Sequence, residues 1–139
     1  MASEFSTEVQ AIVGPLLERL GFVLAEIDDS PDEGGRRQHV VYYRSNDCKI
    51  QVYESSREGE INCMIAPLDA SNEFGLTAEK WYFISYFSKR ADLPPKERLR
   101  LAIAEVQAYD NRLDWVKDRI IKHYETARAG ILEKFGSDS

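Results

Sequence analysis

The stretch CKIQVYESSREGEINCMIAPL, residues 48–68, decides the fold, because it reads as two strand-like arms around one glycine-containing turn. Strand side chains alternate between the two faces of a sheet. The apolar residues occupy even positions in the first arm and odd positions in the second; they are Cys48, Ile50, Val52, Ile61, Cys63 and Ile65. This pattern predicts an antiparallel hairpin with both cysteines of the chain on its apolar face.

The turn of this hairpin decides whether the two cysteines can meet. Opposed residues must share a face, which a four-residue loop at 56–59 or a two-residue loop ending at Gly59 satisfies. The longer loop places Cys48 opposite Pro67, about 13 Å along the strand from Cys63, and the shorter loop separates them further. A disulfide needs Cα atoms within about 7 Å. We therefore expect two reduced, buried thiols.

The spacing of the cysteines gives little support to a zinc site or to a catalytic thiol. Structural zinc sites pair cysteines or histidines a few residues apart, whereas Cys48 and Cys63 are fifteen positions apart and His39 and His123 are isolated. A catalytic thiol needs a nearby base; His39 precedes the neighbouring strand, but the spacing does not require the two to meet. We expect small core residues at both positions, no metal and no cofactor.

Two more strands complete an antiparallel meander. FVLAEID at residues 22–28 and RQHVVYYRS at residues 37–45 are rich in strand-forming residues. A two-residue loop at 46–47 places Val41 opposite Val52, which agrees with the apolar face of the hairpin. The same register also places Tyr43 opposite Ile50.

Tyr42 and Tyr53 share the other face of this meander. Either a helix covers them or they form an exposed apolar patch that could bind another surface. Large exposed apolar patches are uncommon on monomers, which favours the covered arrangement.

Helical periodicity flanks the strands. Residues 5–20 carry apolar side chains at three- and four-residue spacing, with Pro15 bending the helix and Gly21 ending it. Residues 93–109 and 113–135 show the same spacing and predict two C-terminal helices.

The segment between the meander and these helices is ambiguous. A helix starting at Thr77 and running to residue 90 is favoured over a strand, although WYFISYF at 81–87 is rich in strand formers. The chain is therefore predicted to be a single α+β domain over residues 1–139. It comprises an N-terminal helix, a four-stranded antiparallel β-meander, and two to three C-terminal helices packed on the sheet.

Charge is concentrated at the beginning of the chain. The net charge of the 139 residues is −6, and residues 1–35 contain eight acids and one base, a balance of −7. No run approaches the ~20 apolar residues of a membrane span, and the N-terminus lacks the basic and apolar regions of a secretory signal. With reduced thiols, these features predict a cytoplasmic protein that does not bind membranes.

Motifs that carry chemistry are absent from the sequence. It contains no phosphate-binding loop, no HExxH zinc motif and no GxSxG nucleophile motif. The acidic loop at 29–35 lacks the ligand spacing of an EF-hand. Nucleic-acid binding is disfavoured by the acidic balance, although four arginines near strand ends could form a basic strip: Arg36, Arg37, Arg44 and Arg57. No catalytic residue is assigned, and a non-enzymatic role is favoured.

The leading hypothesis is therefore a protein-binding domain whose acidic N-terminal lobe attracts a basic partner protein. The candidate partner-binding residues are Asp28, Asp29, Asp32, Glu33, Tyr42 and Tyr53. The alternative is a small ligand-binding or catalytic domain with a pocket between the sheet and the aromatic segment from Trp81 to Phe87. A third hypothesis is a homodimer joined through its helices or a sheet edge.

The order of elements, the charge and the Leu20-Gly21-Phe22 entry to the first strand resemble several small bacterial α+β families. These include toxin-neutralising immunity proteins and the YbjN or type III secretion chaperone-like group. The resemblance extends over most of the chain. It implies a non-enzymatic protein that binds another protein, and it assigns no individual binding residue.

Overall fold

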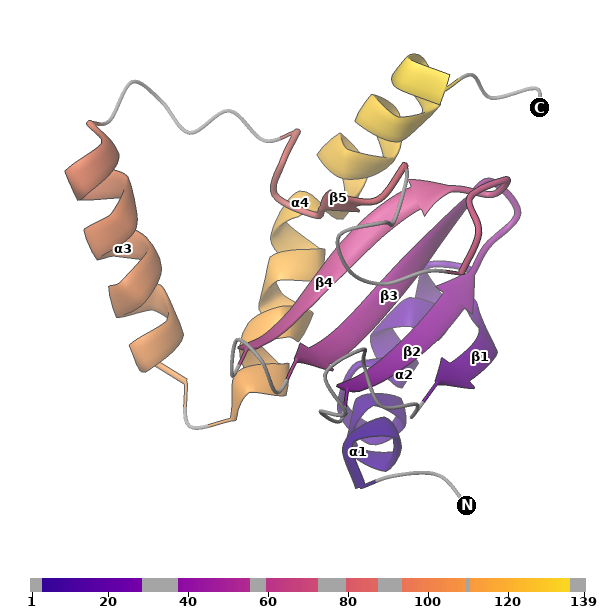
Figure 1. The fold of residues 1–139 in the computed structure, drawn as a ribbon, viewed down its shortest axis with the longest axis horizontal. Helices are drawn as coiled ribbons and strands as arrows, with labels where there is room; N and C mark the ends of the chain where they lie inside the picture. The colour runs from indigo at the N-terminus through magenta and orange to yellow at the C-terminus, as the bar shows by residue number, and fades with distance from the viewer. Residues whose placement is uncertain are drawn as a thin grey trace.

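The computed structural model describes residues 4–28, 38–55, 60–72, 80–87, 94–109 and 111–135. Its fold is α+β, with one antiparallel sheet in the strand order β1-β2-β3-β4-β5 and a long C-terminal helix (Figure 1). The elements are α1 (Glu4–Ile12), α2 (Gly14–Arg19), β1 (Val23–Asp28), β2 (Gln38–Arg44), β3 (Cys48–Ser55), β4 (Glu60–Pro67), β5 (Tyr82–Phe83), α3 (Pro95–Gln107) and α4 (Arg112–Phe135). Within the described residues, no helix combines the length and apolarity that a membrane crossing requires.

The register of the central strands follows the alternation in the sequence. Val41 lies opposite Val52, and Cys48 lies opposite Pro67. Ser55 is paired with Glu60, which leaves four residues between the strands. The expected 46–47 turn and the four-residue alternative for the second turn are confirmed, and the two-residue alternative is wrong.

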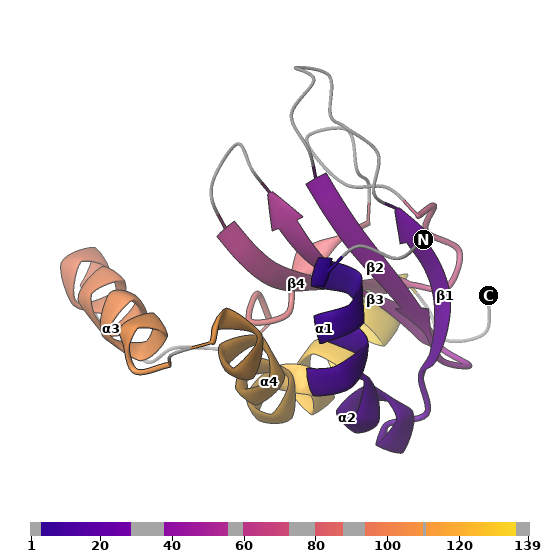
Figure 2. The same cartoon turned by 90° about the horizontal axis from the view of Figure 1, so that it is seen from below.

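One face of the sheet carries the main core. Figures 1 and 2 show α1, α2 and α4 on this face. Helix α4 contributes buried residues at three- and four-residue intervals, as expected for a helix with one apolar face; they include Val116, Ile120, Ala127 and Ile131. Both cysteines belong to this cluster and are fully buried.

The N-terminal helix is broken rather than bent. The sequence predicted one helix through Pro15, but α1 ends at Ile12 and α2 begins at Gly14, with the proline in its first turn. Proline is tolerated at a helix start, because the first N–H groups have no partner within the helix. The break therefore places Pro15 where its missing N–H costs little.

Helix α2 ends in a Schellman motif at Gly21, which has a φ of 93°. The N–H of Phe22 donates to the carbonyl of Leu17 at 2.8 Å, and the N–H of Gly21 donates to that of Glu18 at 3.1 Å. This is the predicted stop at Gly21, and it directs the buried Phe22 ring into the main core.

The second face of the sheet has a smaller core, to which the described residues contribute no helix. Tyr42 and Tyr53 are 1% and 2% exposed, and they cluster with Ala70 and Trp81. The Trp81 ring lies 6.1 Å from that of Tyr42, and its Nε1 donates to the carbonyl of Ser71 at 2.9 Å. The expectation that these tyrosines are covered is confirmed, and among the described residues the cover comes from Ala70 and Trp81, which lie outside the helices.

The aromatic segment is the element for which the favoured sequence prediction is wrong. Residues 82–83 form the short strand β5, and a turn follows at 84–87. Phe83 pairs with Met64 and Tyr82 pairs with Ile65, so the segment extends the sheet beyond β4. The remainder of the predicted helix, 77–79 and 88–90, lies outside the described residues. Pairing with an open sheet edge outweighed local helical periodicity here.

Helix α3 does not pack on the sheet, contrary to the expectation for the C-terminal helices. Figures 1 and 2 both show α3 standing apart from α1, α2, the sheet and α4, which we call the body. Helix α4, by contrast, lies directly against the sheet and shares its core.

Replacement of Gly21 tests the Schellman stop. A Cβ at this position would meet nothing within 4 Å, so the cost of Gly21→Ala comes from the positive φ alone. We expect Gly21→Ala to lower the free energy of unfolding by about 1 kcal/mol in a urea titration. Asn adopts the left-handed region more readily than Ala, so Gly21→Asn is expected to cost less. Equal losses for the two variants would contradict this account.

Candidate functional site

Helix α3 is the most unusual surface element of the fold. None of its described side chains is buried, and Leu99, Leu101 and Ile103 are 63%, 45% and 48% exposed. The shorter α1 buries Phe5 and Val9. A 13-residue helix is marginal in water without an apolar face packed on something else. The apolar side chains of α3 therefore lack a packing partner among the described residues.

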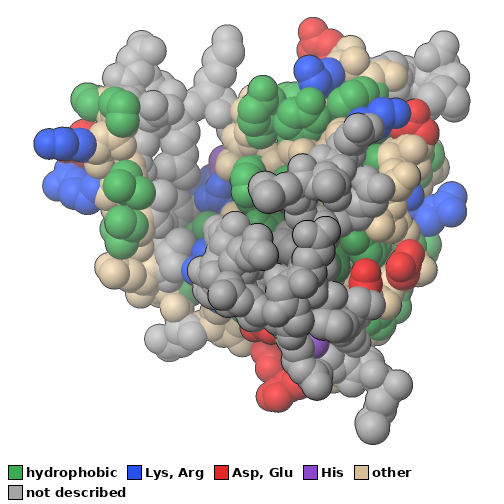
Figure 3. Space-filling view, in the orientation of Figure 1, with side chains coloured by type: hydrophobic (Ala, Val, Ile, Leu, Met, Phe, Trp, Pro, Cys, Tyr) green, Lys and Arg blue, Asp and Glu red, His purple; other side chains and the backbone are tan. Residues whose placement is uncertain are grey.

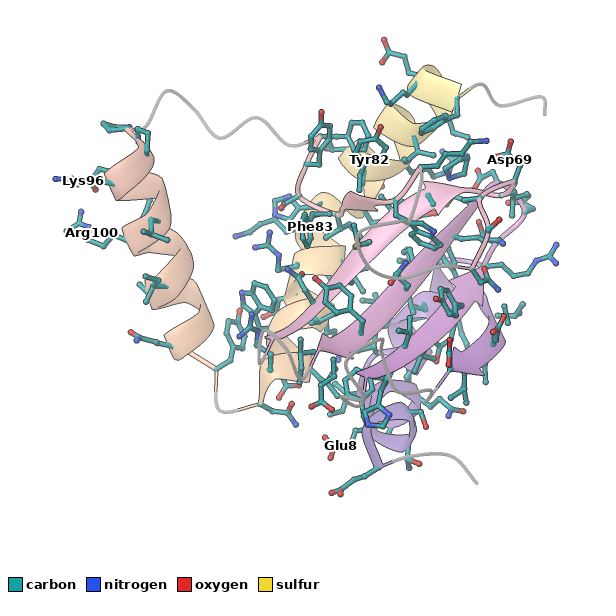
Figure 4. All side chains as sticks on the ribbon, in the orientation of Figure 1. Glu8, Asp69, Tyr82, Phe83, Lys96 and Arg100 are labelled. Atoms are coloured by element: carbon teal, nitrogen blue, oxygen red, sulfur yellow. The ribbon has the colours of Figure 1, made fainter. Side chains whose placement is uncertain are left out.

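The apolar residues of α3 lie on more than one side of the helix. Successive helical residues are about 100° apart, so Leu99 and Ile103 are about 40° apart, whereas Leu101 is about 160° from Ile103. Figure 4 shows Lys96 and Arg100 pointing away from the body. Ile103 shares that outer side, and Leu101 lies on the inner side. A helix that is apolar on two sides requires cover on both.

The connection between α3 and α4 is fixed to α4. It comprises four residues, 108–111. The hydroxyl of Tyr109 donates to Oδ2 of Asp118 at 2.5 Å, and the Tyr109 side chain packs against the main core. Oδ1 of Asn111 accepts from the N–H of Leu113 at 2.8 Å, which caps the start of α4. These bonds hold Tyr109 and Asn111 against the first turns of α4.

The first turns of α4 are stiffened by stacked side chains. The guanidinium carbons of Arg112 and Arg119 lie 4.3 Å and 4.7 Å from the ring centre of Trp115. Cation–π contacts of this kind are strongest for tryptophan and for partly desolvated arginine. Trp115 is 5% exposed, so both guanidinium groups stack on a buried ring.

A hollow separates α3 from the body. Figure 3 shows this space in the space-filling view, with hydrophobic and basic side chains on its body side. Phe83 of β5 is 44% exposed and lies on the side of the body nearest to α3 (Figure 4). The body side of the hollow thus presents an exposed aromatic side chain.

The cysteines do not form a reactive site. Both are free thiols on the core side of the sheet. Burial raises the pKa of Cys48 to about 12, which a hydrogen bond with Ser45 partly opposes, and burial raises the pKa of Cys63 to about 12. A nucleophilic cysteine needs a lowered pKa and access to substrate. The expectation of inert core thiols, without a mutual disulfide, is confirmed.

An ionic clamp joins the β2–β3 turn to α4. Arg128 donates to Oδ2 of Asp47 through Nε at 2.7 Å and through Nη2 at 2.5 Å. The hydroxyl of Ser45 donates to Oδ1 of the same carboxylate at 3.0 Å. Burial would raise the pKa of Asp47, but the bonds from Arg128, Ser45 and Cys48 and the charge of Arg128 together lower it. The sequence analysis missed this clamp, because its two charged residues are 81 positions apart.

A polar network holds the chain segment that covers the second face. Nζ of Lys49 donates to the carbonyl of Ala70 at 2.8 Å and to Oδ1 of Asn72 at 2.9 Å. Asn72 in turn donates to Oε1 of Glu26 at 2.9 Å, which connects the segment to β1. This network and Trp81 are structural features that keep Tyr42 covered.

The predicted partner-binding residues fall into three groups. Asp28 is half-buried at the end of β1, where it pairs with Val40. Tyr42 and Tyr53 are buried in the second core and not on an open surface. The other three, Asp29, Asp32 and Glu33, lie outside the described residues.

The described part of the chain contains no group of three or more histidine, cysteine or acidic side chains able to hold a metal ion. Comparison with known proteins adds no family: no family model, curated protein or solved structure matches this chain. The candidate site therefore rests on the chain's own geometry, namely α3, the hollow and the exposed Phe83.

Thiol labelling tests the burial of the cysteines. With both pKa values near 12 and no exposed surface, we expect neither Cys48 nor Cys63 to react with an aromatic disulfide reagent in the native protein at about pH 8. Both are expected to react after unfolding in denaturant, followed by absorbance of the released thiolate. Rapid labelling of one thiol in the native state would contradict a core position for it.

The Asp47–Arg128 clamp predicts a pH dependence of stability. Because the folded pKa of Asp47 is lowered, its contribution is fully present above the unfolded pKa of about 4 and is lost as pH falls through the folded value. Asp47→Asn should therefore cost about 1 kcal/mol of unfolding free energy at neutral pH. The difference from the unaltered protein should shrink in acid. The exposed Glu133 on the same helix provides the control, Glu133→Gln, for which we expect no comparable loss.

Proposed function

We propose that this chain is a non-enzymatic protein-binding domain and that α3 is its contact element. The observation that supports the proposal is the exposure of Leu99, Leu101 and Ile103 on a helix with no buried side chain among those described. Exposed apolar surface of this kind on an ordered element is typical of protein–protein interaction sites.

The energetics favour a partner protein as the cover. Burial of the exposed parts of these three side chains would contribute about 3 kcal/mol, which is large for a helix of marginal intrinsic stability. In the part of the chain that the structure describes, no segment buries Leu99, Leu101 or Ile103. A second protein chain that contacts α3 would stabilise the helix and bury its apolar surface together.

The acidic first quarter of the chain adds a second element to the proposal. Glu4, Glu18 and Glu26 are exposed, and Glu8 is half-buried. Clustered surface charge speeds association with an oppositely charged partner and makes the rate depend on salt. In this proposal the acidic residues steer a partner with a basic surface, and α3 supplies the contact area.

The alternative of a ligand pocket beneath the aromatic segment lacks a supporting observation among the described residues. The Trp81 ring packs on Tyr42, and Ile84 is fully buried in the main core. The side chains of this segment thus occupy the space that the alternative requires, and the two thiols have pKa values far from those of nucleophiles.

Site-specific photo-crosslinking in the source cells tests the proposal. A benzophenone amino acid placed at Ile103 is expected to capture a protein chain on irradiation, seen as a shifted band and identified by mass spectrometry. Ile121 provides a matched control, because it is also an exposed isoleucine on a helix, 59% exposed against 48% for Ile103. Helix α4 already packs on the sheet through its other face, so the probe at Ile121 is expected to capture nothing.

Two outcomes would count against this function. Absence of an adduct at Ile103 would show that α3 meets no protein in the cell. Equal capture at Ile103 and Ile121 would show that the adducts arise from non-specific collision. Circular dichroism of both labelled proteins verifies that the fold is retained.

A further inference from the structure

A group of aromatic rings lies on the surface where β5 and the turn after it meet the C-terminal end of α4. Figure 3 shows hydrophobic side chains gathered over these elements. The members of the group, which we call the aromatic patch, are Tyr82, Tyr86, Phe87 and Phe135. Neighbouring ring centres are 4.9 to 6.1 Å apart, so the rings form one continuous surface. Tyr86 is 62% exposed, more than any other aromatic side chain that the structure describes.

The aromatic patch is supported from beneath by the body. Its three less exposed rings pack against the main core. Phe87 lies directly over Gly130 of α4, where a Cβ would collide with the ring, so glycine provides the room that Phe87 occupies. The N–H of Tyr86 donates to the carbonyl of Phe83 at 2.8 Å and closes the turn. Tyr86 is therefore presented to solvent on an ordered support, which lowers the entropic cost of binding.

The edge of the aromatic patch carries a positive charge that no described carboxylate neutralises. Nζ of Lys134 lies 5.7 Å from the ring centre of Tyr82, and within the described part of the chain Lys134 forms no ion pair. Lys80, at another edge of the patch, is already paired with Asp69 at 3.0 Å. Residues 80–90 contain three bases and no acid, although the net charge of the whole chain is −6. An acidic group of a ligand on the patch would therefore be attracted to Lys134.

The angles between the rings favour a ligand with small, rigid rings. Neighbouring rings are inclined to one another by 42° to 83°, so the surface is ridged. It is not a flat platform of the kind on which successive bases of a nucleic acid stack. Proline-rich segments in the polyproline II conformation dock on aromatic-lined surfaces, and tyrosine hydroxyls such as those of Tyr82 and Tyr86 can donate to their backbone carbonyls. Because this conformation is preformed, a small contact is sufficient for binding.

We propose that the aromatic patch binds a proline-rich segment of another protein, and that this segment carries an acidic residue that pairs with Lys134. The inference does not rest on α3. The acidic residues that steer a basic partner in the proposed function lie on α1, α2 and β1, and β1 is the opposite edge of the sheet from β5. Glu133 precedes Lys134 on α4, but it lies about 100° around the helix from it. The two surfaces therefore attract ligands of opposite charge to separate parts of the molecule.

Titration of the full chain with a synthetic peptide, followed by amide NMR spectra, provides the first test. The probe is an acetylated peptide of three Pro-Pro-Glu repeats at low salt. We expect saturable shifts confined to residues 80–87 and 130–135, with a dissociation constant of about 50–500 µM. Pro-Pro-Lys repeats keep the prolines and reverse the charge, whereas Gly-Gly-Glu repeats keep the charge and lose the preformed conformation. Each of these matched peptides is expected to bind at least about threefold more weakly.

Substitutions on the patch provide the second test. Tyr86→Ala removes the most exposed ring and is expected to weaken binding of the Pro-Pro-Glu peptide at least about fivefold, whereas Tyr86→Phe, which keeps the ring, should cost less. Lys134→Gln is expected to weaken binding of the Pro-Pro-Glu peptide but not of the Pro-Pro-Lys peptide. Ile121→Ala, an exposed position elsewhere on α4, is expected to leave both affinities unchanged. None of the three residues belongs to either core, so well-dispersed amide spectra verify that each variant folds.

Several outcomes would overturn this inference. One is the absence of saturable shifts up to about 2 mM of the Pro-Pro-Glu peptide. Another is equal binding of the three peptides, or binding that Tyr86→Ala leaves unchanged. Tighter binding of a single-stranded oligothymidylate than of the peptide, lost in Tyr86→Ala, would show that the patch is a nucleic-acid surface instead. None of these results bears on α3 as a contact element, which the crosslinking at Ile103 tests separately.

Discussion

The register of the three central strands is the constraint on which the rest of the fold depends. Val41 lies opposite Val52, and Val52 lies opposite Cys63, so one face of β2, β3 and β4 is apolar throughout. A shift by one residue would turn these side chains toward the second face and move Tyr42 and Tyr53 into the main core. The two turns fix this register, and the Asp47–Arg128 clamp connects the first of them to α4. The position of α4 on the sheet therefore follows from the same alternation that places the strands.

Both faces of the sheet are covered by other elements, which leaves little sheet surface against which α3 could pack. Helices α1, α2 and α4 occupy the main face, and the segment around Ala70 and Trp81 covers the second face. One edge of the sheet is β5, and the other is β1, which is exposed along most of its length and irregular between Leu24 and Glu26. Such an irregularity blunts an edge against further pairing. Helix α3 thus reaches a body whose sheet faces are already filled, which is why it lies beside the body.

The sequence predicted those elements whose signals are local and periodic. Alternation at 48–68, the turn at 46–47 and Gly21 predicted the hairpin register, its neighbour and the end of α2. The prediction was wrong for 81–87, because the aromatic residues there are compatible with both a helix and a strand. Pairing with the edge of β4 selects the strand at Tyr82 and Phe83. The cover over Tyr42 and the Asp47–Arg128 clamp depend on residues brought together from distant parts of the chain. The charge of the sequence suggested the protein-binding hypothesis, which stays a proposal, but it did not single out α3 as the proposed contact element.

One local signal for α3 was nevertheless present in the sequence. Leu99, Leu101 and Ile103 are spaced by two, a strand-like alternation inside a segment that is otherwise helical. In a helix this spacing distributes apolar side chains to opposite sides, so no single packing surface of a monomer can bury them all. A helix with this pattern is stable only when it is enclosed, and an isolated helix of this length is marginal. In the proposed function, formation of α3 and association with a partner are therefore one coupled equilibrium, in which the free energy of contact also orders the helix.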